Sequence, residues 1–251
     1  MMREDTVFGP IRSRRLGSSL GVNLLPRNGK LCNFDCIYCE CGWNRDGLGD
    51  RQLPTAQEVE DALRARLTAC REEGIPIDSI TFSGDGEPTL HPAFAEIIDR
   101  TLAVRDELFP DARVSVLSNA TRVCREDVFR ALRRVDNPIL KIDAPTDALA
   151  ARINRPVGAY HVADVVAALE RFDGDFVLQT MFLRGPDFDS SAPEVLQGWM
   201  EIVRRLHPRE VMVYTLDREA PAEGLEKMTA AGMAALVEPL VREGFRIQIR
   251  G

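Results

Sequence analysis

Hydrophobic and polar positions follow two recurring patterns along this chain. Short apolar runs predict strands at 21–25, 79–82, 113–117, 139–142, 176–182 and 211–214, with a possible seventh at 245–249. Longer amphipathic stretches predict helices at 55–74, 92–108, 126–134, 146–153, 162–171, 191–206 and 228–243. Capping boxes at 55–58 and 191–194 open two of these helices. Because strands alternate with helices, the sequence predicts a parallel sheet.

This alternation favours an α/β barrel, partial or complete, over a doubly wound sheet. Six or seven strand–helix units fit within 251 residues, a usual length for a single barrel. The chain has no internal repeat and no linker, so we expect one domain over residues 1–251, with a core at about 20–220. In parallel α/β folds, functional groups gather just beyond the carboxyl ends of the strands. The loops that follow the strands are therefore where chemistry is expected.

Composition narrows the class of protein only slightly. The net charge is −7, from 39 acidic and 32 basic residues, which excludes a generally basic nucleic-acid-binding surface. Residues 1–31 are nevertheless locally basic. Within them, Arg12-Ser13-Arg14-Arg15 could bind RNA or an anionic substrate; a solvated loop is the alternative. No apolar run approaches the roughly 18–20 residues of a membrane span, and no secretory signal is evident. We therefore expect a cytoplasmic protein with no membrane partner.

The cysteines are the most informative residues. Four of the six, Cys32, Cys36, Cys39 and Cys41, fall within ten positions just after the first predicted strand. Thiolates select zinc, copper(I) or iron–sulfur clusters, and the second cysteine pair of a structural zinc site is missing. A C-x₃-C-x₂-C loop offers three thiolates for an iron–sulfur cluster and leaves one iron open to a substrate or cofactor. Cys41 as a fourth ligand, closing the cluster for electron transfer, is the alternative.

Polar residues follow the second and third predicted strands. Gly84 and Gly86 flank Asp85 and precede Glu87, so the backbone can approach a ligand closely; an ordinary turn is the alternative. Ser118 and Asn119 end the third strand, where they either hold ligand hydroxyl or carboxylate groups or cap a helix.

Charged and polar residues also end the later strands. Lys141 and Asp143 lie two apart, on one strand face, where they must be paired, bind a ligand or lie at a solvated rim. Gln179 and Tyr214 end the fifth and sixth strands. Lys141, Gln179 and Tyr214 are the candidate catalytic residues. We assign no metal to a histidine: His91 is expected to start a helix, and His161 and His207 to lie at the surface. Cys70 and Cys124 are expected to be ordinary thiols.

The cysteine loop, with Tyr38 before its last cysteine, resembles the signature of the radical S-adenosylmethionine (SAM) superfamily. This resemblance implies a partial (β/α)6 TIM-like barrel of the radical SAM type, with a possible extra C-terminal strand. It implies a [4Fe-4S] cluster held by Cys32, Cys36 and Cys39. Asp85-Gly86-Glu87-Pro88 resembles the motif that binds the methionine amino group of SAM, with Asp85 in place of a glycine. The residues implied at the SAM site are Tyr38, Gly84, Asp85, Gly86, Glu87, Ser118, Asn119 and Asp143.

The resemblance also implies an activity. A reduced ferredoxin or flavodoxin-like donor would supply an electron to cleave SAM, and a 5′-deoxyadenosyl radical would abstract hydrogen from a substrate. Segments 33–39 and 153–156 are similar to the branch containing the wyosine-forming tRNA-guanine enzymes, over about residues 5–220. No cysteine precedes Cys32 to hold that branch's second cluster, and no lysine matches its catalytic one. The substrate therefore stays open between tRNA, a peptide and a small molecule. A tRNA base-modifying enzyme, a non-catalytic iron–sulfur electron-transfer protein using Cys41 and a non-catalytic barrel scaffold are the alternatives.

Overall fold

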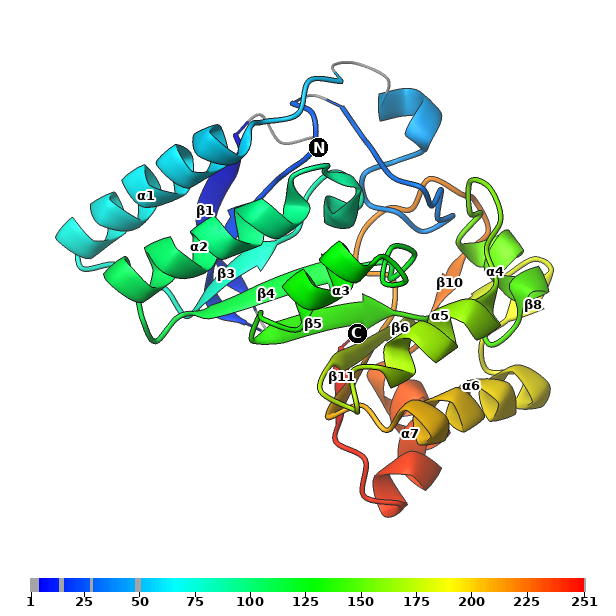
Figure 1. Ribbon diagram of the computed structural model, residues 1–251. Helices are drawn as coiled ribbons and strands as arrows, with labels where there is room; N and C mark the ends of the chain where they lie inside the picture. Colours follow the sequence, from blue (N-terminus) through cyan, green and yellow to red (C-terminus); the bar gives the residue numbers. More distant parts are fainter. Residues whose placement is uncertain (1–4, 14–15, 28, 48–50, 251) are drawn as a thin grey trace. The chain divides into compact units, whose positions relative to one another are not determined.

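The computed structural model describes residues 5–13, 16–27, 29–47 and 51–250 (Figure 1). These residues form two compact units, each described by itself below. Unit 1 contains the chain up to Cys32 together with Asn44–Ser118 and Arg125–Pro138. Unit 2 contains Asn33–Trp43, Asn119–Cys124 and the chain from Ile139 onward. Most of the cysteine loop thus belongs to unit 2. A single domain over 1–251 stays a prediction.

Four strands form the sheet of unit 1: β1 (Val7–Ser13), β2 (Gly17–Val22), β3 (Ser79–Phe82) and β4 (Arg113–Ser118). β2, β3 and β4 pair in parallel, and β1 adds an antiparallel edge that the sequence did not predict. The first predicted strand, at 21–25, is wrong in its bounds, since β2 ends at Val22. The reason is a local turn, in which the Asn23 side chain accepts a hydrogen bond from the backbone of Leu25 (3.2 Å) and the chain leaves the sheet.

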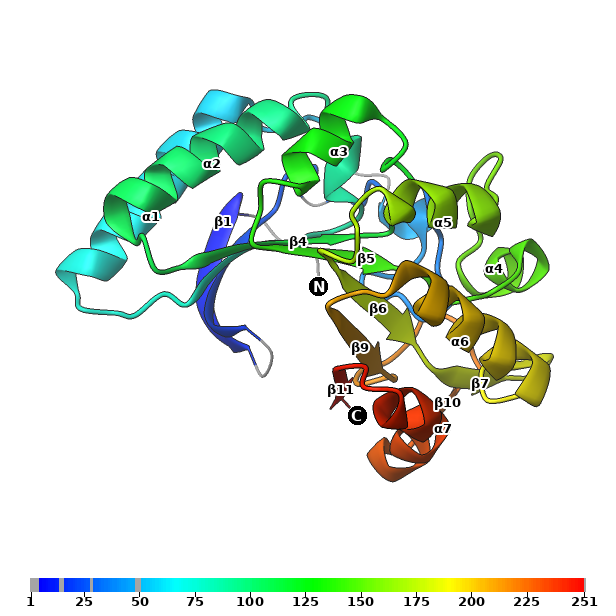
Figure 2. The ribbon, with the colours of Figure 1, turned by 60° about the horizontal axis from the view of Figure 1, so that its bottom comes forward.

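Helices cover one face of this sheet. α1 (Ala56–Glu72), α2 (Phe94–Leu108) and α3 (Glu126–Leu132) lie side by side in Figure 2. Two 3₁₀ turns, η1 (Asn44–Gly47) and η2 (Pro88–Leu90), complete the unit. The predicted capping box of the first helix is confirmed, with Thr55 and Glu58 bonded to each other's backbone. Leu63 and Leu67, one turn apart on α1, are fully buried, so this face of the helix packs into the core.

The sheet of unit 2 is parallel and holds the later predicted strands. β5 (Asn137–Lys141), β6 (Val177–Met181), β9 (Glu210–Tyr214) and β11 (Ile247–Arg250) pair in that order. The possible seventh strand is therefore confirmed as β11. A second, antiparallel sheet of very short strands was not predicted; it contains β7 (Leu183–Gly185), β8 (Phe188–Asp189) and β10 (Glu226–Lys227).

The helices of unit 2 are α4 (Asp147–Ile153), α5 (Val162–Glu170), α6 (Pro193–Leu206) and α7 (Ala230–Arg242). Trp199 of α6 is buried against the sheet and donates a hydrogen bond to Thr180 of β6 (3.0 Å). The capping box predicted at 191–194 is wrong: Ala192 is the N-cap residue, without a side-chain cap. The Ser191 hydroxyl instead bonds Asp189 (2.5 Å), which holds the preceding turn.

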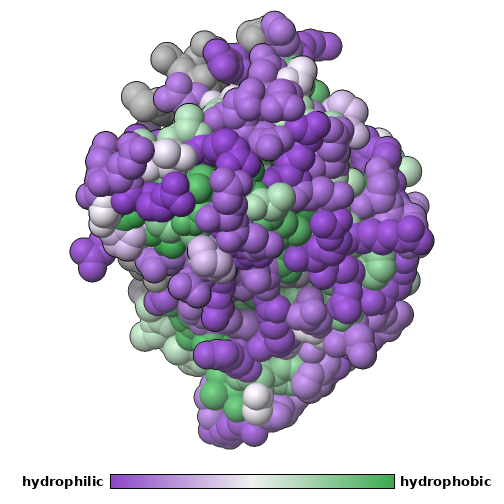
Figure 3. Space-filling model, turned by 60° about the vertical axis from the view of Figure 1, so that its left-hand side comes forward, coloured by the Kyte–Doolittle hydropathy of each residue, from purple (hydrophilic) through white to green (hydrophobic). Residues whose placement is uncertain are grey.

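The surface seen in Figure 3 is mainly hydrophilic, and hydrophobic residues appear on that face as separate small patches. Within the described residues, none of the helices combines the length and the apolar character that a bilayer crossing requires. The strands pair mainly in parallel and are connected largely by helices. The predicted α/β class is therefore confirmed.

Candidate cofactor site

None of the thiols of the cysteine loop (residues 32–41) forms a disulfide. Cys36 is buried, whereas Cys32, Cys39 and Cys41 are partly exposed. Cys32 belongs to unit 1, and the other three cysteines of the loop belong to unit 2. Among the described residues, no three Cys, His, Asp or Glu side chains converge closely enough to hold a metal ion.

Backbone hydrogen bonds fix the unit 2 part of the loop beside the end of α4. The amides of Asp35 and Ile37 donate to the carbonyls of Asn154 (2.9 Å) and Ile153 (3.0 Å). The amide of Val157 donates back to the carbonyl of Asn33 (2.9 Å). The pairing resembles a short strand ladder, so the backbone around Cys36 is held on its partner segment.

Asp143 provides a second connection to the loop. Its side chain is completely buried and accepts hydrogen bonds from the Tyr38 hydroxyl, from Nδ2 of Asn154 (2.6 Å) and from the backbone amide of Met181 (2.9 Å). The Lys141 ammonium lies 3.6 Å from the same carboxylate. Of the alternatives for Lys141 and Asp143, the structure therefore shows pairing. Asp143 connects the end of β5 to the cysteine loop, α4 and β6.

Tyr38 lies at the centre of this network. Its hydroxyl donates to Asp143 and accepts a hydrogen bond from Nζ of Lys141 (2.7 Å). Burial, and then the neighbouring Asp143 carboxylate, raise the pKa of Tyr38 well above its ordinary value. The phenol therefore stays protonated and keeps its donor hydrogen. Nζ of Lys141 also lies over the Tyr38 ring, 5.1 Å from its centroid.

The Cys36 sulfur faces two nitrogen donors. Nδ2 of Asn154 is 3.4 Å from Sγ, and Nζ of Lys141 is 3.6 Å from it. Burial raises the pKa of the Cys36 thiol, while the Lys141 charge and the Asn154 hydrogen bond oppose that rise. The surroundings therefore include groups that stabilise a thiolate once a metal displaces the proton.

Asn119 also contacts the loop. Its Nδ2 donates to Oδ1 of Asn33 (2.8 Å), and its Oδ1 accepts from the amide (3.1 Å) and hydroxyl (2.7 Å) of Thr121. Nδ2 of Asn33 closes the ring on the Thr121 hydroxyl (2.7 Å). Asn119 does not cap the following helix, because the N-cap residue there is Arg125. Its side chain instead secures the start of the cysteine loop within unit 2.

Two residues with left-handed backbone follow these asparagines. Ala120, after Asn119, has φ +62°, and Arg155, after Asn154, has φ +48°. Such angles cost about 1–3 kcal/mol outside glycine and persist where surrounding contacts dictate them. Both lie directly beside a residue that bonds the cysteine loop. The strained backbone at Ala120 and Arg155 therefore lies at the two segments that hydrogen-bond to the cysteine loop.

Glu87 is the central residue of the unit 1 part of the site. It is only 2% exposed, and its Oε1 accepts from the amide (3.0 Å) and hydroxyl (2.5 Å) of Thr89 and from the Ser118 hydroxyl (2.8 Å). Glu87 and Ser118, each expected at the SAM site, are therefore in direct contact. Together they join the loop after β3 to the end of β4.

The glycines beside Glu87 allow close packing of backbone. Gly86 has φ +144°, and a Cβ built there would lie 1.9 Å from the carbonyl oxygen of Leu31. A Cβ at Gly84 would lie 2.0 Å from Oδ1 of Asn23. The carbonyl of Asp85 accepts from the Leu31 amide (3.0 Å), and its side chain is buried. The glycine turn thus holds the segment that leads into Cys32.

The candidate catalytic residues share one face of the unit 2 sheet. Lys141 of β5 is in register with Gln179 of β6, and Gln179 with Met212 of β9. Tyr214 lies two residues beyond Met212, so it points to the same side. Gln179 is buried and Tyr214 half-buried. The structure thus places the three candidates on one surface of unit 2.

The three histidines and the basic segment at 12–15 are not among the residues expected at the cofactor site. His91 precedes α2, and its ring accepts from the Ala93 amide (3.1 Å), so its role at a helix start is confirmed. His161 and His207 are exposed, as predicted. Arg12 is exposed on β1, whereas the neighbouring arginines 14 and 15 lie outside the described residues.

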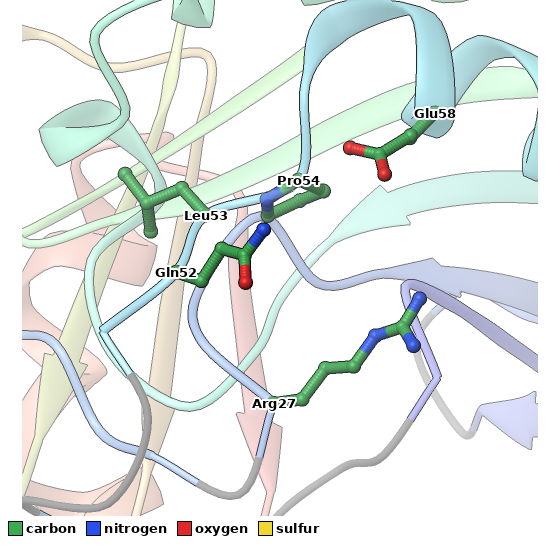
Figure 4. Close-up of a pocket in the computed structure, with 5 residues that line it drawn as sticks. All are labelled: Arg27, Gln52, Leu53, Pro54 and Glu58. Carbon is green, nitrogen blue, oxygen red and sulfur yellow. The ribbon is translucent and has the colours of Figure 1, made fainter.

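A pocket of about 210 Å³ on unit 1 contains none of the predicted site residues (Figure 4). Its lining residues are Arg27, Gln52, Leu53, Pro54 and Glu58.

Comparison with protein families identifies the class. Residues 29–190 match the model of the Radical SAM superfamily, a span that includes the whole cysteine loop and the ends of the second to fifth predicted strands. The chain belongs to this superfamily. Its members are enzymes that use a [4Fe-4S] cluster and SAM, so these are the cofactors of this chain.

Curated relatives include UPF0026 proteins. One from Methanocaldococcus jannaschii is 28% identical over 213 residues, covering 83% of this chain and 62% of the relative. One from Synechocystis sp. is 30% identical over 223 residues, covering 86% of this chain and 77% of the relative. The chain therefore spans about three fifths of the length of the archaeal relative.

Solved structures confirm the fold class. A radical SAM methyltransferase from Sphaerobacter thermophilus matches with TM-score 0.69 at 18% identity, over 92% of this chain and 65% of that one. TYW1 with a lysine–pyruvate adduct bound matches with TM-score 0.65 at 13% identity, over 91% and 75%. The protein anSMEcpe with bound AdoMet matches with TM-score 0.61 at 13% identity, over 91% and 63%. These likenesses confirm the fold class, a partial barrel of the radical SAM type.

Proposed function

We propose that this chain is a radical SAM enzyme in which Cys32, Cys36 and Cys39 hold the [4Fe-4S] cluster. The donor set fits the group, because three soft thiols that form no disulfide, in a C-x₃-C-x₂-C spacing, suit the irons of a cluster. The observation that carries the proposal is the way the cysteine loop is held in unit 2. Its backbone pairs with the end of α4, and Tyr38 is bonded to the buried Asp143. These contacts fix the backbone on both sides of Cys36, so this part of the loop has less freedom left to lose on cluster binding.

SAM is proposed to bind Tyr38 of the cysteine loop and residues at the ends of the second to fourth predicted strands, namely Gly84, Asp85, Gly86, Glu87, Ser118, Asn119 and Asp143. When bound, the cluster and SAM supply one-electron chemistry that yields methionine and a 5′-deoxyadenosyl radical able to abstract hydrogen from a substrate. The buried carboxylate of Glu87 is suited to an ammonium group, because it supplies negative charge in a site of low polarity. Ser118 orients that carboxylate through its hydrogen bond to Oε1.

The hydrogen bonds around Tyr38 and Asp143 in unit 2 are also proposed to position the cysteine loop. Tyr38 stays protonated, so its hydroxyl donates to Asp143 rather than adding a negative charge beside the thiols. Asn119 and Asn33 hold the start of the loop. These contacts orient the cysteines and exclude water from the buried side of the loop.

An electron donor and a substrate complete the proposed reaction. A reduced ferredoxin or flavodoxin-like protein is proposed as the donor. The substrate is a tRNA, a peptide or a small molecule, and Gln179 and Tyr214 are proposed to face it from the sheet of unit 2.

Anaerobic reconstitution with iron and sulfide tests this proposal. The wild-type protein should take up about four irons per chain and form 5′-deoxyadenosine from SAM and dithionite. Cys36→Ala should lose both properties. Cys70→Ala is the matched control, since Cys70 is a buried thiol of α1 outside the loop and its loss should leave both intact. A wild-type protein that binds zinc and leaves SAM uncleaved would contradict the proposal.

The alternative with Cys41 as fourth ligand needs its own variant. Cys41→Ala should retain the full iron content and SAM cleavage if three cysteines hold the cluster. Loss of iron in this variant, with no 5′-deoxyadenosine from the wild type, would instead favour an electron-transfer protein.

A further inference from the structure

Two side chains of unit 2 direct nitrogen donors at the sulfur of Cys36. Asn154 approaches it from the end of α4, with Nδ2 3.4 Å from Sγ. Lys141 approaches from the end of β5, with Nζ 3.6 Å from Sγ. Both distances are within the range of hydrogen bonds to the large sulfur atom. No sequence motif described above assigns either residue to a cluster ligand.

The orientation of the Asn154 amide follows from its other partner. Nδ2 lies 2.6 Å from Oδ2 of Asp143, a carboxylate oxygen that accepts hydrogen bonds. The amide nitrogen must therefore be the atom that faces Asp143, which also sets which atom faces Cys36. One hydrogen of the amide bonds Asp143, and the other is left for the Cys36 sulfur or the Tyr38 oxygen, 3.4 Å away.

Lys141 is held just as firmly. Its side chain is 14% exposed, and Nζ donates to the Tyr38 hydroxyl (2.7 Å) while lying 3.6 Å from Oδ2 of Asp143. Tyr38 and Asp143 thus keep the ammonium beside Cys36 instead of letting it extend into solvent. The positive charge is therefore a fixed feature of the surroundings of this sulfur.

We propose that Asn154 and Lys141 are positioning residues that donate N–H···S hydrogen bonds to the Cys36 thiolate and raise the reduction potential of the cluster. This inference rests on the proposed function. Reduction adds negative charge that is shared by the ligand sulfurs, so donors and a nearby cation stabilise the reduced state more than the oxidised one. The assignment also gives Lys141 a role other than that of a catalytic residue.

The test is a redox titration of the reconstituted protein followed by electron paramagnetic resonance. Asn154→Leu removes the amide donor at similar volume, and Lys141→Gln removes the charge. Each should shift the midpoint potential to a more negative value. Arg152→Gln is the matched control, because it removes a positive charge from α4 where the side chain is 56% exposed. Its potential should equal that of the wild type.

A spectroscopic readout separates hydrogen bonding from a general effect on folding. Pulsed resonance spectra of the reduced wild type should show an exchangeable proton coupled to the cluster, which disappears in deuterated buffer. Asn154→Leu should lack part of that coupling. If Asn154→Leu takes up no iron, the potential of Lys141→Gln decides the question.

Unchanged potentials in the variants that bind iron would overturn the inference and leave the proposed function standing. A wild-type protein that assembles no cluster would overturn both. Equal shifts in Arg152→Gln and Lys141→Gln would also refute the inference, since the effect would then be one of overall charge.

Discussion

Replacing Asp143 by alanine should destabilise unit 2 strongly. The substitution removes the acceptor of three buried donors, on Tyr38, Asn154 and Met181, and the counter-ion of Lys141. A buried donor left without a partner costs about 1–3 kcal/mol. Three such donors imply a loss of roughly 3–9 kcal/mol, with water entering the space offsetting the upper part of that range. This is a large share of the roughly 5–15 kcal/mol that stabilises a typical domain.

Urea denaturation followed by circular dichroism measures this loss. Asp143→Asn should fall between wild type and alanine, because its side-chain oxygen can still accept from the Met181 amide. Asp147→Ala is the control: this carboxylate is half-exposed at the start of α4, pairs with the exposed His161 and accepts from one backbone amide, that of Val162 (2.8 Å), so its removal should cost only about 1 kcal/mol. If Asp143→Ala is no less stable than Asp147→Ala, the proposed role of the buried network is refuted.

Two further predictions concern single groups. Gly86→Ala should destabilise the protein more than Gly74→Ala: both glycines have positive φ, but only at Gly86 would the added methyl group press against Leu31. Gly74 has open space around it, so its substitution should cost only the backbone strain, about 1 kcal/mol. Equal losses of stability in thermal unfolding would contradict the close packing at Gly86. The Asp147 hydrogen bond raises the pKa of His161, so nuclear magnetic resonance should show this ring titrating above 6.5 and Asp147→Asn should lower the value. The His161–Asp147 pair stabilises the fold below the pKa that histidine has in the unfolded chain, and this contribution is lost as the pH rises through the raised pKa of the folded state. An identical titration of His161 in Asp147→Asn would show that the hydrogen bond does not cause the raised pKa.

The sequence predicts the parallel strands well because each is a short apolar run bounded by turns. The strand predicted at 79–82 matches β3 residue for residue. β1 was missed because Gly9-Pro10 interrupts its pattern and because an antiparallel edge strand need not be apolar on both faces. β7, β8 and β10 are two or three residues long, which is too short to show any periodicity.

The candidate site was predictable where spacing alone carries the chemistry. The three cysteines lie within eight positions, so their closeness along the chain alone indicates a shared ligand. The bond between Tyr38 and Asp143 joins residues 105 positions apart, and only the tertiary fold brings them together. The same holds for Asn154. In the sequence it looks like an ordinary helix end, because Pro156 follows two residues later. Its contact with Cys36 has no local signal.

The central claim is that three cysteines hold a cluster with one iron open to SAM. Electron paramagnetic resonance of the reduced, reconstituted protein with and without SAM tests it most directly. SAM should change the g values of the cluster signal, because it is proposed to bind the iron without a cysteine ligand. A cluster signal that is the same with and without saturating SAM would contradict it.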